Sequence, residues 1–193
     1  MKLTSMTTSE LLAAFRSSEP TPGGGSASAL AGAVGASLLA MVAGLPKPKA
    51  TNDEDLRQLG DAGAQCSALA VQLEGLIDED SAAYDLVVGA FRMPKRTDEE
   101  KAARSAGIQR ALTAATEAPL NVMRRCAEAL ALAPTIAALG NQNASSDVAV
   151  ARALLSAGLT GARENVDINL ESIRDEGFAE GVRREIESLI PDH

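Results

Sequence analysis

Apolar residues recur along this chain at spacings of three and four, the pattern of helices that bury one face. The longest such stretch has its apolar residues at Leu56, Leu59, Cys66, Leu69, Leu73, Leu76, Tyr84, Val87 and Phe91. No long run alternates between apolar and polar residues as a half-buried strand would. We therefore expect an all-α fold: an up-and-down bundle of about six helices, several of them long, in a single domain spanning residues 1–193.

Local signals indicate where the helices begin and end. Capping boxes, which satisfy free N–H groups in the first turn, occur at Thr7–Glu10, Thr51–Glu54 and Thr97–Glu100. Single capping residues are expected at Ser26, at either Ser145 or Ser146, and at Asp175. The expected ends are at Pro46 with Pro48, at Phe91 before Pro94, at Gly140 and at about Ile173. Pro119 is expected to kink or break its helix.

The segment 27–45 carries no charge and consists mainly of Ala, Gly and Ser. Small residues form two rows at four-residue spacing, Ser28, Gly32, Ala36, Ala40, Gly44 and Gly25, Ala29, Ala33, Ser37. Each helical glycine costs up to about 1 kcal/mol relative to alanine, which indicates close approach by neighbouring helices. A membrane span has this length, but the scarcity of large apolar side chains disfavours insertion. A buried central helix is the preferred interpretation.

Composition narrows the classes of function. The net charge of −8 argues against nucleic acid and anionic membranes as partners. The polar N-terminus does not resemble a secretory signal, so we expect a cytoplasmic protein. Cys66 and Cys126 fit no metal-ligand spacing and are expected to be free, buried thiols. The one histidine, His193, is the last residue, which disfavours histidine catalysis and His-rich metal sites.

Asp80 is the first candidate for chemistry. It lies on the apolar stripe of its helix, four residues after Leu76 and four before Tyr84. A carboxyl group in that position faces the interior or a cleft, and desolvation raises its pKa into the range of a general base or acid. The alternatives are a place at the margin of the stripe or a pair with an arginine. Asp78 and Glu79 lie off the stripe and are expected to be solvated.

Other polar and glycine-rich segments have two interpretations each. The turn Gly23, Gly24, Gly25, Ser26 precedes a helix, whose free N–H groups attract anions, but ordinary turns share this composition. Asn165 and Asn169 either link helices or recognise a ligand. The segment from Gly140 through Asn141 to Ser146 and Asp147 is by itself a helix cap. Lys47, Lys49 and Lys95 follow prolines in loops, as anion contacts or as solvated surface.

Five segments, in this order and with matching spacing, resemble the cyclodeaminase/cyclohydrolase family, the C-terminal half of formiminotransferase-cyclodeaminase and its stand-alone bacterial relatives. They are TSELLAAF, PTPGGGSASALAGAVGASLLAMVAGL, DEDSAAYDLVVGAFRMPKRTDEEKAAR, GNQNASSD and GLTGARENVDINLESIRDEGF. The resemblance implies an all-helical homodimer acting on a one-carbon unit that bridges N5 and N10 of tetrahydrofolate. Members without a formiminotransferase half include methenyltetrahydrofolate cyclohydrolases, so hydrolysis to 10-formyltetrahydrofolate is preferred. The alternative is the cyclodeaminase, which releases ammonia from 5-formiminotetrahydrofolate.

The resemblance also implies roles for the candidate residues. The methenyl bridge is a cationic amidinium, so the tetrahydrofolate derivative is a substrate that needs neither metal nor cofactor. The implied catalytic residues are Asp80, Tyr84 and Asp147, with Ser81 as a neighbour. The implied substrate contacts are Gly23, Gly24, Gly25, Ser26, Asn141, Ser146, Asn165 and Asn169, with Lys95 near the glutamate tail. Family members often carry a lysine-rich segment with a tyrosine after the small-residue helix, whereas this chain has Pro46-Lys47-Pro48-Lys49-Ala50.

Two alternatives belong to other classes. A helical folate-binding or scaffold protein without activity would have the same fold, and in it Asp80→Asn would change neither folate binding nor physiology. A membrane-associated bundle would sediment with membranes.

Overall fold

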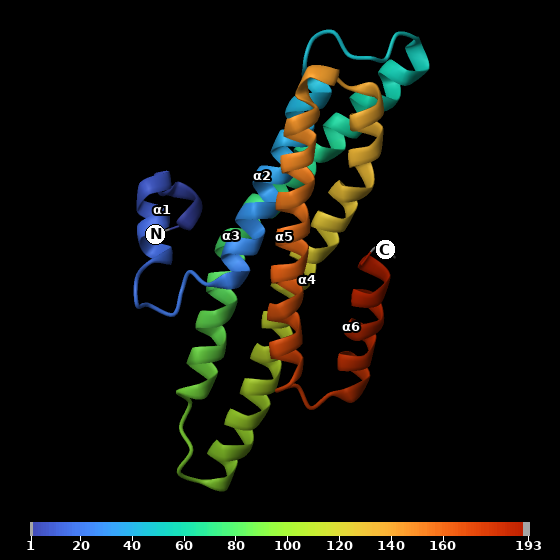
Figure 1. Ribbon diagram of the computed structural model, residues 1–193. Helices are drawn as coiled ribbons and strands as arrows, with labels where there is room; N and C mark the ends of the chain where they lie inside the picture. The colour runs from blue at the N-terminus through green and yellow to red at the C-terminus, as the bar shows by residue number, and fades with distance from the viewer. Residues whose placement is uncertain (1, 191–193) are drawn as a thin grey trace.

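The computed structural model describes residues 2–190, so His193 lies outside the described part of the chain (Figure 1). These residues form helices without any strand, which confirms the all-α prediction. The helices are α1 (Thr8–Phe15), α2 (Gly24–Gly44), α3 (Asp53–Phe91), α4 (Asp98–Leu139), α5 (Ser145–Leu170) and α6 (Glu176–Leu189). Short 3₁₀ turns lie at Leu3–Ser5 and Gln142–Ala144.

Helices α2 to α5 run up and down beside one another, with α6 along one side of the bundle and α1 at the other (Figure 1). α2 packs against α3, α4 and α5. In the described residues it is the one helix long and apolar enough to cross a membrane, by length and composition only. Ten of its residues are buried in this packing, which confirms the prediction of a central small-residue helix.

Small residues allow α2 to approach its neighbours α5 and α4 closely. A Cβ at Gly158 would lie 2.8 Å from the carbonyl O of Ser28, and one at Gly32 would lie 2.7 Å from Sγ of Cys126. Both cysteines are free and buried, as predicted. Burial raises the pKa of Cys66 to about 11 and that of Cys126 to about 12, so both thiols stay protonated at neutral pH.

Pro119 does not break its helix, because α4 continues through it from Asp98 to Leu139. A proline at 119 cannot donate a hydrogen bond to the carbonyl O of Ala115, four residues earlier. That oxygen instead accepts a bond of 3.2 Å from the side-chain amide of Asn169 on α5. A neighbouring helix thus supplies the missing donor.

Three predicted helix starts are displaced. α2 begins at Gly24, so Ser26 lies inside its first turn. Asn52 rather than Thr51 caps α3, accepting from the N–H of Asp55. Neither Ser145 nor Ser146 caps α5, because the preceding 3₁₀ turn leads directly into the helix. One predicted end is also displaced: α5 ends at Leu170, three residues before the expected end. The boxes at Thr7 and Thr97 and the cap at Asp175 are confirmed.

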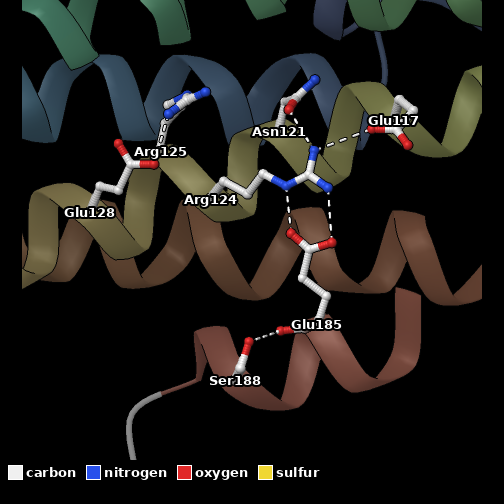
Figure 2. Close-up of polar contacts among 7 residues, drawn as sticks. All are labelled: Glu117, Asn121, Arg124, Arg125, Glu128, Glu185 and Ser188. Atoms are coloured by element: carbon white, nitrogen blue, oxygen red, sulfur yellow. Dashed lines mark hydrogen bonds and ion pairs between the residues drawn. The ribbon is translucent and has the colours of Figure 1, made fainter. Parts of the chain in front are cut away.

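The prediction that Asp78 is solvated is wrong, because the N-terminal turn covers its side chain. Its carboxylate accepts a 2.6 Å bond from the N–H of Leu3 and a 2.7 Å bond from the hydroxyl of Thr4. At the other side of the bundle, Arg124 of α4 donates two bonds to Glu185, which fixes α6 (Figure 2).

Candidate active site

A cavity of about 330 Å³ lies where α2 begins, between α3 and α5. α3 and α4 continue past the start of α2, so the first turn of α2 forms one wall of this cavity (Figure 1). Residues from five parts of the chain line it: Pro20, Thr21, Gly23, Gly24, Gly25, Asp80, Ala83, Tyr84, Val87, Ala115, Asn165, Ile168 and Asn169. Seven of the residues proposed from the sequence are thereby brought together.

Asp80 is half-buried at the base of this group. Its Oδ2 accepts a hydrogen bond of 2.9 Å from the hydroxyl of Ser26, and in residues 2–190 no lysine or arginine forms an ion pair with it. Burial raises the pKa of Asp80 above the ordinary range of a carboxyl group, and hydrogen bonds from Ser26 oppose part of that rise. A carboxyl group of this kind takes up and releases protons closer to neutral pH.

The glycine turn brings the start of α2 against this carboxylate. A Cβ at Gly25 would overlap Oδ1 of Asp80, and one at Gly24 would lie 3.4 Å from Nδ2 of Asn165. No side chain caps this helix at Gly23, so its first N–H groups and the positive end of its dipole face the acid. A side chain at position 25 would therefore displace the carboxylate.

The two amides of α5 form the opposite wall. Nδ2 of Asn165 donates 2.7 Å to the carbonyl O of Gly161, and Nδ2 of Asn169 donates to Ala115. Each amide thereby uses one of its two N–H donors, and its second N–H and its side-chain oxygen have no protein partner among the described residues. The sequence offered two roles for these amides, linking helices or recognising a ligand. Asn169 links α5 to α4 and also lines the cavity.

Tyr84 and Ile168 form the outer rim of the cavity and are 41% and 64% exposed. Thr21, Ala115 and Ile168 line it although the sequence did not single them out. Ile168 follows Asn165 by three residues, so helical spacing was a usable signal. Ala115 has no such signal, because only the packing of α4 brings it here.

Ser26 and Ser81 lie behind Asp80 and do not line the cavity. Ser26 is fully buried, and its hydroxyl lies 3.2 Å from that of Ser81. The residue expected to contact substrate therefore contacts the carboxylate instead.

Three other predicted residues lie at the far end of α2 and α5. Asn141 donates 2.7 Å to the carbonyl O of Pro46, beyond the end of α2, and it borders a separate cavity of about 180 Å³. Asp147 precedes Asn165 by 18 residues of one helix, or about 27 Å at 1.5 Å per residue. Within one chain, Asn141, Ser146 and Asp147 do not reach the Asp80 cavity.

Lys95 is exposed in the connection between α3 and α4. Eleven residues of α3 separate Asp80 from Phe91, about 16 Å along the helix. Lys95 therefore does not line the Asp80 cavity, whereas Lys47 and Lys49 lie near Asn141.

A family model and several known proteins match this chain. The family model described as formiminotransferase-cyclodeaminase matches residues 7–188. The chain is 44% identical to a methenyltetrahydrofolate cyclohydrolase of Methylorubrum extorquens, over 91% of this chain and 85% of that protein. It is 33% identical to the formimidoyltransferase-cyclodeaminase of Rattus norvegicus, over 89% of this chain but 32% of that longer protein.

A solved structure also matches. The formiminotetrahydrofolate cyclodeaminase of Thermotoga maritima superposes with a TM-score of 0.85 at 26% identity, over 97% of this chain and 90% of that one. The family match spans nearly all of the described bundle, including every element that lines the Asp80 cavity. The chain therefore belongs to the formiminotransferase-cyclodeaminase family.

Proposed function

We propose that this protein hydrolyses 5,10-methenyltetrahydrofolate to 10-formyltetrahydrofolate, with Asp80 as the catalytic acid–base residue. The observation that carries the proposal is the half-buried carboxylate at the edge of a 330 Å³ cavity, against a glycine-walled helix start. The similarity to a cyclohydrolase across 85% of that protein's length supports this choice of reaction.

In the first step a water molecule attacks the bridge carbon. The bridge is a cationic amidinium and already electrophilic, so Asp80 has to accept one proton from the water as the new C–O bond forms. The products of this step are a neutral carbinolamine and a protonated Asp80. The carboxylate also stabilises the cation electrostatically before the attack, in a site with little water to screen it.

In the second step the bond from the bridge carbon to N5 breaks. Asp80 returns its proton to N5, and the carbinol O–H releases its proton to solvent as the formyl C=O forms. Asp80 is again a carboxylate, and the sum is one water consumed and one proton released. The reaction needs no cofactor, because the substrate supplies the electrophile.

The cavity walls offer complementary contacts for the folate. The oxygens of Asn165 and Asn169 would accept from pterin N–H groups, while Tyr84 and Ile168 would pack against the rings. Lys95 would meet the carboxylates of the glutamate tail, which a cation stabilises. The span of about 16 Å along α3 suits the tail end of an extended ligand.

We also propose that the protein is a homodimer in the cytoplasm, without membrane or nucleic-acid partners. α2 carries no charged side chain, and Val34 and Met41 on it are 43% and 40% exposed. Asn141, Ser146 and Asp147 would contact substrate only at a cavity of the second subunit, so their proposed roles depend on the dimer.

The cyclodeaminase is the second candidate, favoured by the Thermotoga maritima structure of that name. The same acid would protonate the leaving ammonia while N10 closes the bridge. A scaffold without activity predicts neither reaction.

Incubating the purified protein with 5,10-methenyltetrahydrofolate and following its near-ultraviolet band tests the proposal. We expect the band to decay faster than in buffer or with heat-inactivated protein. A decay equal to the buffer rate would overturn the hydrolase. Ammonia release from 5-formiminotetrahydrofolate, measured in parallel, would establish the cyclodeaminase, and the absence of both reactions would leave the scaffold.

A further inference from the structure

Ser26 is fully buried behind the Asp80 carboxylate, and three oxygen atoms surround its hydroxyl. Its Oγ lies 2.9 Å from Oδ2 of Asp80, 3.0 Å from the carbonyl O of Ile77 and 3.2 Å from Oγ of Ser81. A side chain without exposed surface cannot touch a ligand in the cavity. Any effect of Ser26 on the reaction therefore passes through Asp80.

The hydroxyl of Ser26 cannot serve all three neighbours at once. It carries one proton, and the carbonyl of Ile77 only accepts. The hydroxyl of Ser81 lies farther away, at 3.2 Å, and can itself donate, so the two acceptors that compete for the Ser26 proton are Asp80 and Ile77. The ionised carboxylate is the stronger acceptor, whereas a neutral carboxyl group competes less well with the carbonyl. Ser81 completes the set, because its hydroxyl can donate to Ser26 in either arrangement.

The two oxygens of Asp80 are thereby made different. Oδ2 accepts from Ser26, while in residues 2–190 no side chain donates to Oδ1. Oδ1 lies against Gly25, which lines the cavity. The oxygen left without a hydroxyl donor is therefore the one nearer to this cavity-lining glycine.

We propose that Ser26 is a positioning residue for the proton transfer: it pins Oδ2, leaves Oδ1 to exchange the proton, and turns its hydroxyl between Asp80 and Ile77 as Asp80 changes charge. Ser81 steadies this hydroxyl in both states. The proton moves only between the reacting water or N5 and Oδ1, and no heavy atom of the site has to move. This inference rests on the proposed function of Asp80.

The other residues that line the cavity include few groups that could change the pH profile. Tyr84, also on α3, is the other titratable residue lining it. α2 contributes glycines, α4 contributes Ala115, and α5 contributes Asn165, Ile168 and Asn169. None of these carries a charge, so a change in the acid limb of the pH profile reports on Asp80 and its hydroxyl partners.

The test compares pH profiles of kcat and KM for Ser26→Ala with those of the wild type. We expect kcat to fall about tenfold with KM nearly unchanged, because a charge-assisted donor is lost from a group that touches substrate. We also expect the acid limb to move to higher pH, because the ionised form loses its donor. Ser28→Ala is the matched control, since the Ser28 hydroxyl bonds its own helix at Gly24.

A second pair of variants separates the hydroxyl from the packing. Ser81→Ala should shift the acid limb in the same direction as Ser26→Ala but less, and Ser81→Thr, which keeps the hydroxyl, should restore the wild-type profile. If Ser26→Ala does not fold, this pair carries the test. Profiles of Ser26→Ala and Ser81→Ala that coincide with those of Ser28→Ala would overturn the inference.

Carboxyl ¹³C NMR makes the outcome independent of turnover. The Asp80 signal is assigned by its loss in Asp80→Asn and is titrated in the wild type and in Ser26→Ala. A higher titration midpoint in Ser26→Ala supports the positioning role even if the wild type turns over neither folate, a result that would overturn only the proposed function. An unchanged midpoint would overturn the positioning role itself.

Discussion

Asp80 meets two physical demands with one carboxyl group. Asp80 belongs to α3, and its carboxylate lies against the start of α2. No side chain caps the free N–H groups there. The same carboxyl group also borders the cavity. The positive end of the helix favours its ionised form, whereas burial favours the neutral form. Burial prevails, since the pKa of Asp80 is raised. A carboxyl group held between these two influences is suited to alternate between base and acid.

The raised pKa determines how activity depends on pH. If Asp80 acts as the base, kcat/KM falls as the pH drops through its pKa, and we expect this acid limb above the ordinary carboxyl value near 3.8. By linkage, the neutral carboxyl contributes stability that is present below its ordinary pKa and is lost as the pH rises through the raised one. Measuring kcat/KM against pH in the wild type checks this. A limb at or below the ordinary value would mean that Asp80 is solvated.

Gly25 tests how closely α2 must approach the acid. In Gly25→Ala the new methyl group would overlap Oδ1 of Asp80, so we expect kcat to fall by about 100-fold, the scale for misplacing a reacting group. Gly44→Ala is the matched control on the same helix, because nothing lies within 4 Å of a Cβ there. Equal activity of the two variants in the near-ultraviolet assay would contradict this placement of the carboxylate.

At this scale the sequence predicted the interior position of Asp80 but not its hydrogen-bond partner. The apolar stripe of its helix was enough to place Asp80 at an interior position, because period and burial are coupled within one helix. The role of Ser26 could not be derived, because its contact with Asp80 joins residues 54 apart. Ser26 was therefore assigned to the substrate, and packing places it behind the acid.

At the scale of elements, α5 supplies a hydrogen-bond donor that α4 lacks. Pro119 leaves the carbonyl of Ala115 without its intrahelical partner, and Asn169 of α5 supplies one. Asn169 is thereby held at the cavity wall. The sequence contained both residues but no sign that they act together, so the proline was expected to kink or break its helix. Starts with a complete capping box were predictable, because all their contacts lie within one turn.

A double-mutant cycle tests this coupling between α4 and α5. Asn169→Ala should lower the free energy of unfolding by about 1–3 kcal/mol, because it leaves a buried carbonyl without a donor. In the Pro119→Ala background the new N–H at 119 can serve that carbonyl, so the loss should be smaller. Urea unfolding of the four proteins gives the coupling energy. Equal losses in both backgrounds would show that Asn169 does not replace the missing donor.

At the scale of the whole molecule, the predicted site residues other than Lys95 fall into two groups at opposite ends of α2. One group surrounds Asp80, and the other surrounds Asn141. The sequence order of the motifs was informative about the family but not about this separation, because chain order does not report which ends of antiparallel helices meet. A dimer is the arrangement in which both groups could serve one substrate.

Light scattering checks the assembly. We expect the purified protein at micromolar concentration to have twice the chain mass of 19.8 kDa, because the uncharged face of α2 has exposed apolar side chains to cover. A monomer with full hydrolase activity would remove Asn141, Ser146 and Asp147 from the proposed site.

The activity of Asp80→Asn on 5,10-methenyltetrahydrofolate is the most direct measurement. The amide keeps the shape of the carboxyl group but cannot take up the proton of the attacking water, so we expect kcat to fall about 100- to 10,000-fold with the circular dichroism spectrum unchanged. If Asp80→Asn is folded and the near-ultraviolet band of the substrate decays with it at a rate within about twofold of the wild-type rate, the assignment of Asp80 as the acid–base residue is contradicted.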